Sequence, residues 1–454
     1  MPCTARALVV ALAAGLLLAG CSQVVAGKPN AAAGAARITV APVADAEVAP
    51  TAVAALQEYW RAQFPAAFGR PWRDIGRFLP VHARDRRVPC VRSAADVKGQ
   101  AFYCPAADTV VWDADGLIPE VLRVEGPTGV LVVLAHEVGH AVQNRLGLDE
   151  LQERQPSRYP TILLEAMADC SAGVALAHFA QQPPPGLALG ADERDRAMSA
   201  LIAFRDPLGV EPGDNGAHGN AFDRVSAFQD GYDGAATTCA QMTITNRAFT
   251  QRAFGSRADA ARRGNLPVDE LLEGVGTDAP SAFARLAASA GLPGWQAPPL
   301  STTAGRCAVA AQGPAAWCPE EDTVVVDRAA IGQLEDRFGD FAGATLIASR
   351  YGLAVLQALR RETTGASAIC LAGAYTGGLL KADGSFTLSP GDLDEAVEVL
   401  LRQDWAGRDP AGAADPRQHG YERIALFRKG VVSGPPSPGA GAPPRLRRDR
   451  RGRG

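Results

Sequence analysis

Residues 135–143 read AHEVGHAVQ, and an apolar run at residues 130–134 precedes them. On an α-helix with about 3.6 residues per turn, His136 and His140 project from one face, one turn apart. Both imidazoles can then bind a single Zn²⁺ at about 2.0–2.1 Å. Glu137 lies beside them, where its carboxylate can take a proton from metal-bound water and deliver it to a leaving amine. This stretch therefore predicts a helix that carries two metal ligands and a general base.

A third ligand is needed, because catalytic zinc takes three protein ligands and leaves the fourth position to water. Residues 164–170 read LEAMADC. On a helix Glu165 and Asp169 are one turn apart, so Glu165 can bind the metal while Asp169 accepts the N–H of a metal-bound histidine. A solvated carboxylate is the alternative for Glu165, but its apolar neighbours disfavour an unpaired charge.

The order of these motifs resembles that of the bacterial, actinobacterial-type family of neutral zinc metallopeptidases, with a gluzincin-like Glu-x-x-x-Asp arrangement. The resemblance implies a zincin-like fold, a Zn²⁺ cofactor and peptide-bond hydrolysis. It assigns zinc binding to His136, His140 and Glu165 and the base to Glu137, but no particular substrate. It covers about residues 90–240 and includes His218, Gly219, Arg224, Phe228, Gly231 and Cys239.

A zincin also needs a donor that stabilises the oxyanion, normally a Tyr, His or Arg side chain. His218, Tyr159 and Arg224 are the candidates in this chain. A structural role is favoured for His218 and Arg224, since both recur in the second half of the chain, where the zinc motif is missing.

An internal repeat runs through the chain, with a period of roughly 200–214 residues. FYCPAADTVVWD at 102–113 returns as AWCPEEDTVVVD at 316–327, and ADCSAG at 168–173 returns as AICLAG at 368–373. Residues 195–201 match 394–400, and His218 and Arg224 are echoed by His419 and Arg423. The chain is therefore predicted to contain two related domains, 46–245 and 265–430, that pack on each other.

The second copy is degenerate at the positions that matter for zinc, so residues 265–430 are predicted to be catalytically inactive. Ser349, Arg350 and Leu353 replace His136, Glu137 and His140, and Gly365 and Ile369 stand opposite Glu165 and Asp169.

Few strand patterns occur in either copy. Residues 53–64 have the spacing of a helix, residues 109–112 that of a short strand, and residues 128–146 that of a second helix. The predicted class is therefore mainly α with a small β-sheet (α+β).

The two ends of the chain have their own signals. Arg6 and the apolar run at 7–18 are typical of a signal peptide over residues 1–20, and LAGC at 18–21 resembles a lipobox in which Cys21 is acylated, for example by palmitate. A plain signal peptide with an incidental cysteine is the alternative. Residues 21–45 are predicted to be a flexible tether, and residues 431–454, rich in Pro, Gly and Arg, a disordered tail. The mature protein is expected outside the cytoplasm, anchored to the membrane through Cys21.

Outside the cytoplasm cysteines form disulfides. Cys90 and Cys104 flank a loop that the second copy keeps between Cys307 and Cys318, so each pair is predicted to be bridged. Cys170 is then expected to pair with Cys239. This pairing leaves Cys370 without a partner, so it is predicted to be an unpaired thiol.

Length and charge limit the remaining functions. With 454 residues the chain is long enough for two cores, and a net charge of −4 argues against nucleic-acid binding. The predicted function is an extracytoplasmic peptidase that acts on peptides or proteins. The alternatives are a non-catalytic zinc-binding envelope lipoprotein, acting as scaffold or binding module, and a metal-independent solute-binding lipoprotein.

Overall fold

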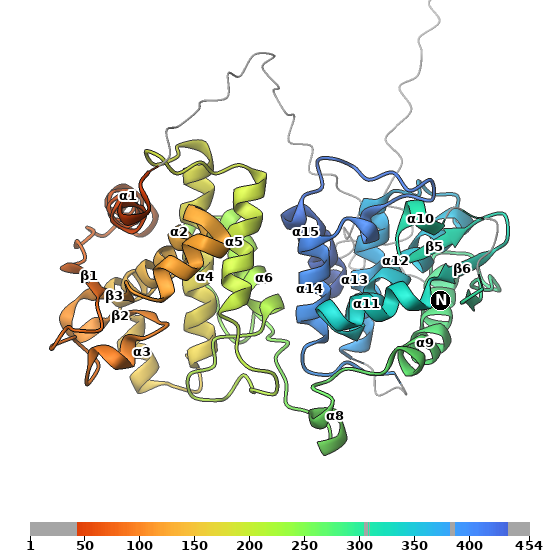
Figure 1. The fold of residues 1–454 in the computed structure, drawn as a ribbon, viewed down its shortest axis with the longest axis horizontal. Helices are drawn as coiled ribbons and strands as arrows, with labels where there is room; N and C mark the ends of the chain where they lie inside the picture. The colour runs from red at the N-terminus through yellow and green to blue at the C-terminus, as the bar shows by residue number, and fades with distance from the viewer. Residues whose placement is uncertain (1–42, 304–306, 308, 382–385, 435–454) are drawn as a thin grey trace, which may run out of the picture.

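The computed structural model describes residues 43–303, 307, 309–381 and 386–434. The predicted signal peptide, the lipidation site Cys21 and most of the predicted tether and tail lie outside these ranges. Figure 1 shows two helical halves side by side, each with a small sheet at its outer end. The predicted class, mainly α with small sheets, is confirmed.

The first half forms a helical layer against one three-stranded sheet. The strand order is β1-β3-β2, with β1 parallel and β2 antiparallel to β3, so β2 is an edge strand. In chain order the elements are α1 (Asp45–Phe68), β1 (Arg77–Val81), β2 (Ala101–Cys104), β3 (Thr109–Asp113), α2 (Leu117–Leu146), α3 (Leu148–Arg154), α4 (Thr161–Gln181), α5 (Ala191–Ala203), α6 (Ala221–Tyr232) and α7 (Ala236–Ala240).

Helix α2 is longer than the sequence predicted. It begins at Leu117 and bends at Gly126, whose φ is 72°, immediately before Pro127. A glycine at positive φ followed by a proline is an ordinary signal for the start of a helix, which is why the sequence indicated a beginning near residue 128. The part after the bend, which carries His136 and His140, was predicted correctly.

A glycine brings α2 and α4 close together. A Cβ added at Gly139 would lie 2.9 Å from both the Cα and the carbonyl oxygen of Ala168. Because real Cβ atoms do not approach backbone so closely, only glycine allows this packing. The close approach sets the residues of α4 against the histidines of α2.

The second half has a sheet of the same design, with order β4-β6-β5, β4 parallel and β5 antiparallel to β6. The tandem duplication itself stays a prediction from the sequence. After the short α8 (Arg257–Ala261), the elements are α9 (Val268–Ser289), β4 (Leu300–Ser301), α10 (Val309–Gln312), β5 (Ala315–Cys318), β6 (Thr323–Val326), α11 (Arg328–Phe338), α12 (Asp340–Ala358), α13 (Gly365–Leu379), α14 (Asp392–Arg402) and α15 (Gly420–Ser433).

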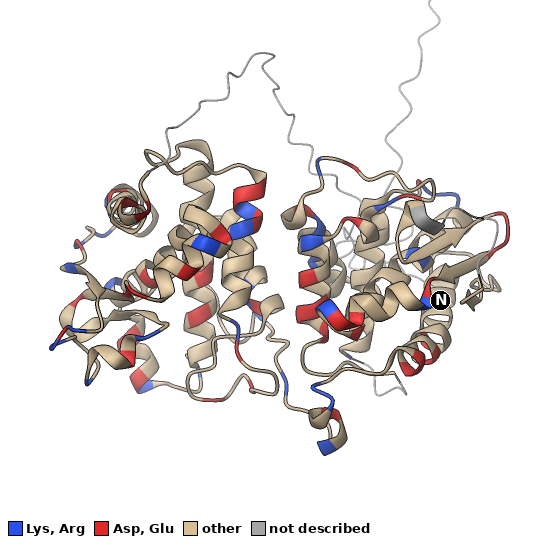
Figure 2. Cartoon of the chain, in the orientation of Figure 1, with Lys and Arg blue, Asp and Glu red and all other residues tan. Residues whose placement is uncertain are grey.

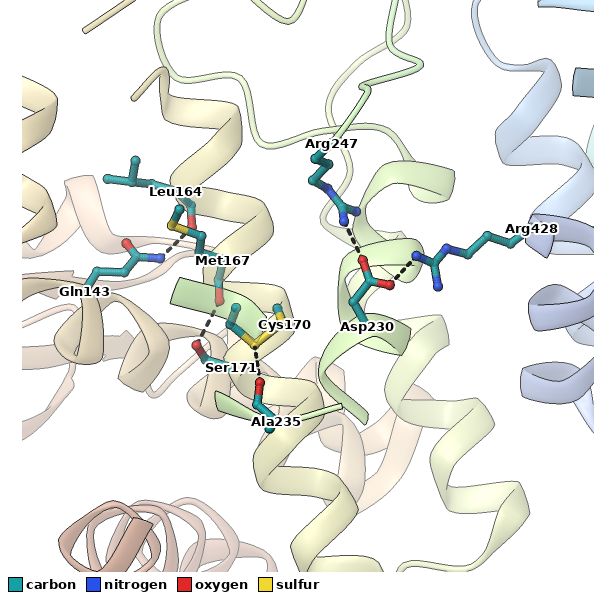
Figure 3. The surroundings of a disulfide bond; sticks show 10 residues. Gln143, Leu164, Met167, Cys170, Ser171, Asp230, Ala235, Arg247 and Arg428 are labelled. Atoms are coloured by element: carbon teal, nitrogen blue, oxygen red, sulfur yellow. Dashed lines mark hydrogen bonds and ion pairs between the residues drawn. A yellow bond between two sulfur atoms is a disulfide. The ribbon is translucent and has the colours of Figure 1, made fainter. Parts of the chain in front are cut away.

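The two halves meet where α5 and α6 face α14 and α15, and charged side chains of both signs occur along these helices (Figure 2). Arg194 pairs with Glu422 at 2.5 Å, and Arg205 pairs with Asp394 at 3.2 Å. Asp230 joins Arg247 of its own half to Arg428 of the other half (Figure 3). The interface is therefore held by ion pairs as well as by packing.

Three disulfides connect the pairs expected from the sequence: Cys90–Cys104, Cys170–Cys239 and Cys307–Cys318. The second of these links α4 to α7 close to the metal-binding segment (Figure 3). The prediction that Cys370 is an unpaired thiol is wrong, because this cysteine is also disulfide-bonded. Counting cysteines within the second copy alone did not reveal that bond.

Helix α4 is apolar and long enough to cross a membrane, but 89% of its most hydrophobic window is buried inside the protein. It therefore serves as a core helix of the first half, and its Glu165 and Asp169 are buried charges that need partners.

Candidate metal centre

The structure brings His136, His140 and Glu165 together from two helices. The Nε2 atoms of the histidines lie 3.2 Å apart, and Glu165 oxygens lie 3.1 Å from His136 Nε2 and 3.5 Å from His140 Nε2. Ligand atoms about 2.0–2.1 Å from a tetrahedral zinc are about 3.3 Å apart along each edge. The spacing between the two histidines, with one Glu165 oxygen near each of them, is therefore compatible with three ligands of a tetrahedral zinc.

Hydrogen bonds at the far side of each ring decide which nitrogen faces the site. His136 Nδ1 lies 2.7 Å from Asp169 Oδ1, a carboxylate that can only accept, so Nδ1 carries the hydrogen. His140 Nδ1 lies 3.1 Å from Gln143 Oε1, and the amide of Gln143 donates to the Leu164 carbonyl at 2.6 Å (Figure 3). Both Nε2 atoms thus face each other and a carboxylate, an arrangement that either a metal ion or protons between them would stabilise.

Arg224 of α6 holds the second carboxylate in place. Its Nε and Nη2 donate to the two oxygens of Asp169 at 2.9 and 2.8 Å, and its Nη1 donates to the Phe204 carbonyl at 2.6 Å. Asp169 is fully buried, so this bidentate pair provides its counter-charge. The chain Arg224–Asp169–His136 therefore orients the first metal ligand.

The electrostatics of the site also fit a cation. One oxygen of Glu165, Oε2, is buried and faces His136 Nε2 at 3.1 Å without a well-oriented hydrogen bond. Burial by itself would lower the pKa of His136, but the charges and hydrogen bonds of Asp169 and Glu165 outweigh it and raise the pKa to about 10. Burial would likewise raise the pKa of Glu165, yet His140 and His136 hold it well below its usual value. Protons and a metal ion therefore compete for the same lone pairs.

Glu137 lies in a cleft of about 1070 Å³ that also contains the three ligands. Its side chain is 7% exposed, and within the described part of the chain no hydrogen bond or ion pair occupies its carboxylate. A carboxylate beside the metal ligands and without another partner is suited to act as a base.

The oxyanion candidates differ in position. His218 lines the cleft, and its Nδ1 lies 3.1 Å from Asp206 Oδ1. Tyr159 lines a neighbouring hollow of about 970 Å³ rather than the cleft. Arg224 borders the cleft but directs its donors at Asp169 and Phe204. His218 is thus the candidate with a ring nitrogen left for a ligand.

Sequence reasoning assigned no role to Gln143, Asp206 or the residues of β2. Gln143 stands three residues after His140, so helical spacing could have identified it. No spacing links Asp206 to His218 or the 99–103 segment to the histidines. Their positions depend on how loops and the sheet pack against α2.

Among the residues of the second half that the structure describes, no counterpart of this centre occurs. Arg350 of α12 is fully buried and donates to the carbonyl oxygens of Trp405 and Arg408 at 2.7 and 3.1 Å. Burial, together with the charge of Arg408, lowers its pKa to about 9. The inactivity of this half remains a prediction, supported by a guanidinium at the position that corresponds to Glu137.

A helix with an HExxH motif, a carboxylate ligand from a second helix and a free glutamate in a cleft define a zinc-binding metallopeptidase class. The chain belongs to the family described as "Putative neutral zinc metallopeptidase", which matches residues 4–242 and so includes the whole site. The family implies zinc as the metal.

The chain is also similar to several uncharacterized bacterial proteins. Over 148 residues the chain is 33% identical to the uncharacterized protein YpfJ of Escherichia coli, a match that covers 29% of this chain and 50% of YpfJ. It is 32% identical over 149 residues to uncharacterized proteins of Mycobacterium bovis and Mycobacterium tuberculosis, again with 29% and 50% covered. The chain thus spans about half the length of these relatives. No solved structure matches it.

Proposed function

We propose that this protein is a zinc-dependent peptidase that hydrolyses peptide bonds with Glu137 as general base. The observation that carries the proposal is the convergence of His136, His140 and Glu165 beside an unengaged Glu137 in an open cleft. A scaffold needs the three ligands but not this carboxylate.

Zinc bound by these ligands would activate a water molecule and polarise the carbonyl of the scissile bond. Glu137 would take a proton from the water and pass it to the leaving amine. Asp169 and Arg224 would keep His136 in the tautomer that the metal needs, and Gln143 would do the same for His140.

His218 is proposed to stabilise the developing oxyanion. Its hydrogen bond to Asp206 raises the pKa of His218, so that the ring is more readily a donor. The other ring nitrogen is left for a substrate oxygen, and donors aimed at a developing charge are among the largest contributions to catalysis.

An extended peptide is the substrate that the cleft favours. Residues 99–103, which include most of edge strand β2, line it, and β2 pairs with β3 on one side only. The backbone groups on its other edge can therefore bind a peptide as an added strand, with the scissile bond carried towards Glu137. The neighbouring hollow, lined in part by the same Gln152 and Thr161, leaves room for residues beyond that bond.

The location is proposed from the sequence. Acylation of Cys21 after cleavage of residues 1–20 would anchor the protein to the outer face of the cell membrane, with residues 21–45 as the tether. This proposal takes Cys3 and Cys21 out of the set of cysteines that could pair with Cys370, so mass spectrometry of the mature N-terminus and of the Cys370 bond tests it.

The decisive experiment compares wild type with Glu137→Gln on a library of unstructured peptides. We expect the variant to keep one zinc per chain and to lose at least about 100-fold in rate. Glu150→Gln is the matched control, because Glu150 pairs with Arg154 on the surface of α3, outside the cleft. Equal hydrolysis by wild type and Glu137→Gln, or zinc binding without any hydrolysis by wild type, would favour a non-catalytic zinc-binding lipoprotein.

A further inference from the structure

Three buried carboxylates meet at the beginning of two helices in the second half, outside the cleft. Asp340 is the first residue of α12, and Asp392 and Glu395 lie in the first turn of α14. Each contributes an oxygen, and these oxygens lie within 4.8 Å of one another. The three residues are only 4, 5 and 7% exposed, so solvent does little to screen their charges.

Hydrogen bonds satisfy only part of this cluster. The Oδ1 atoms of Asp340 and Asp392 are buried and accept no hydrogen bond. One other oxygen of each carboxylate accepts a backbone N–H: Leu266 donates to Asp340 at 2.9 Å, Ser389 to Asp392 at 2.8 Å and Phe341 to Glu395 at 2.8 Å. Apart from the other carboxyl groups of the cluster, these two acceptors have no hydrogen-bond partner among the described residues.

Positive charge is missing as well. Among the residues that the structure describes, no Arg, Lys or His side chain forms an ion pair with any of the three. Arg252 is the cation near enough to lower the pKa of Asp392, but its guanidinium donates to the Leu388 carbonyl. Asp259, Glu335 and Asp394 add further negative charge around the cluster.

The fold keeps the cluster tightly closed. Gly339 precedes Asp340 at a φ of 99°, and a Cβ there would lie 2.0–2.4 Å from the carboxylate of Glu395. Three carboxylates that lie this close together and are this well buried repel one another and are poorly solvated. The charged forms of these groups therefore need a cation or must give way to shared protons.

We propose that Asp340, Asp392 and Glu395 bind a hard divalent cation, with Ca²⁺ as the first candidate, at a structural site separate from the zinc site. An all-carboxylate set without His or Cys suits Ca²⁺, Mg²⁺ or Mn²⁺ rather than zinc. Ca²⁺ accepts irregular oxygen geometry, whereas Mg²⁺ demands a near-ideal octahedron. The ion would tie the start of α12 to the start of α14, next to the interface with the first half.

The test uses the zinc-loaded full chain in buffer freed of other divalent ions, at about pH 7.5, because a higher pH reduces the competition of protons with the metal. Adding Ca²⁺ should raise the melting temperature by about 2–4 °C when the free Ca²⁺ concentration is about ten times the dissociation constant. Titration calorimetry should show one Ca²⁺ per chain. Tb³⁺ bound to the unmodified protein should luminesce, and added Ca²⁺ should displace it and reduce the luminescence.

Variants separate this site from zinc and from general charge effects. D392N combined with E395Q should abolish the Ca²⁺ response. D336N removes a charge from the exposed surface of α11 and should keep the response, as should H136A, which disables the zinc site.

Two results would overturn the proposal. One is a Ca²⁺ response that survives in the double variant. The other is a wild-type chain that responds to none of Ca²⁺, Mg²⁺ or Mn²⁺, which would mean that the carboxyls share protons instead.

Discussion

Asp195 and Asp394 each cap the start of a helix in the opposite half of the molecule. Asp195 of α5 accepts the backbone N–H groups of Gly420 and Tyr421 at 2.6 and 2.9 Å, at the start of α15. Asp394 of α14 accepts the N–H of Ala221 at 2.8 Å, at the start of α6. The two aspartates occupy matching positions of the repeat predicted from the sequence, and each caps a helix of the opposite half.

Replacing Asp195 by Ala should weaken the contact between the halves. The change leaves two N–H groups at the start of α15 without an acceptor, and each buried orphan costs about 1–3 kcal/mol. We expect a lower free energy of unfolding in urea, with the second half unfolding first. Asp336→Ala, on an exposed part of α11, is the control and should change stability little. Unchanged unfolding of Asp195→Ala would show that this cap does not hold the halves together.

Replacing Arg224 by Lys should reduce zinc affinity by roughly 10–100-fold, the range found when groups behind a metal ligand are altered. Lysine cannot reproduce the two hydrogen bonds to Asp169, so His136 loses its orientation. Competition with a chromogenic chelator measures the change. Arg423→Lys is the matched control, because Arg423 donates to the Leu400 and Leu401 carbonyls and touches no metal ligand. An equal loss of zinc affinity in both variants would argue against a positioning role for Arg224.

Gly139→Ala should both destabilise the protein and disturb the metal centre. The added methyl meets the backbone of Ala168 at 2.9 Å, and overpacking of this kind costs about 1–3 kcal/mol. Because the shift moves α4 away from α2, we expect weaker zinc binding and a slower peptidase rate. Gly352→Ala meets Ala368 at 3.2 Å in the second half and should lower thermal stability without affecting zinc. Full zinc affinity in a destabilised Gly139→Ala protein would contradict this account.

Ionisation of the buried Asp394 carboxyl should lower the free energy of unfolding as the pH rises. Burial raises its pKa from 3.8 to about 7, although Arg205 and the N–H of Ala221 oppose the shift. Between these two pH values the folded protein binds more protons at Asp394 than the unfolded chain does. The contribution of Asp394 to the free energy of unfolding is therefore fully present below about pH 4 and is lost as the pH rises through about 7. At about 1.4 kcal/mol per pKa unit the effect amounts to a few kcal/mol.

Asp394→Asn keeps an acceptor for Ala221 but cannot ionise. Its stability relative to wild type, measured by urea unfolding at several pH values, should increase from about pH 4 to about pH 8. A difference that stays constant over this range would show that Asp394 has an ordinary pKa.

Local patterns were enough to predict much of the site. His136 and His140 lie one turn apart on a helix because the helical period acts within a few residues, and the same holds for Glu165 and Asp169. Two disulfides could be predicted because the cysteines of each copy flank the same short loop, and Cys170–Cys239 was then the pair left in the first copy. The class of fold followed from the scarcity of strand patterns.

Contacts between distant segments could not be predicted in this way. No pattern in the sequence indicated that Arg224 would hold Asp169, that Asp206 would orient His218, or that β2 would border the cleft. Cys370 was assigned wrongly for the same reason, since its bond depends on which cysteine the folded chain brings to it.

The amino-acid sequence by itself predicted the candidate ligands, the candidate base and the approximate boundaries of the helices that carry them, because these predictions depend on spacing along one segment. Only the tertiary structure decided that Glu165 reaches the histidines, that Asp340 meets Asp392 and Glu395, and that Asp195 and Asp394 exchange caps. Contacts of this kind depend on the angle and the separation at which packed helices cross. Both are properties of the whole core and not of any one stretch of sequence.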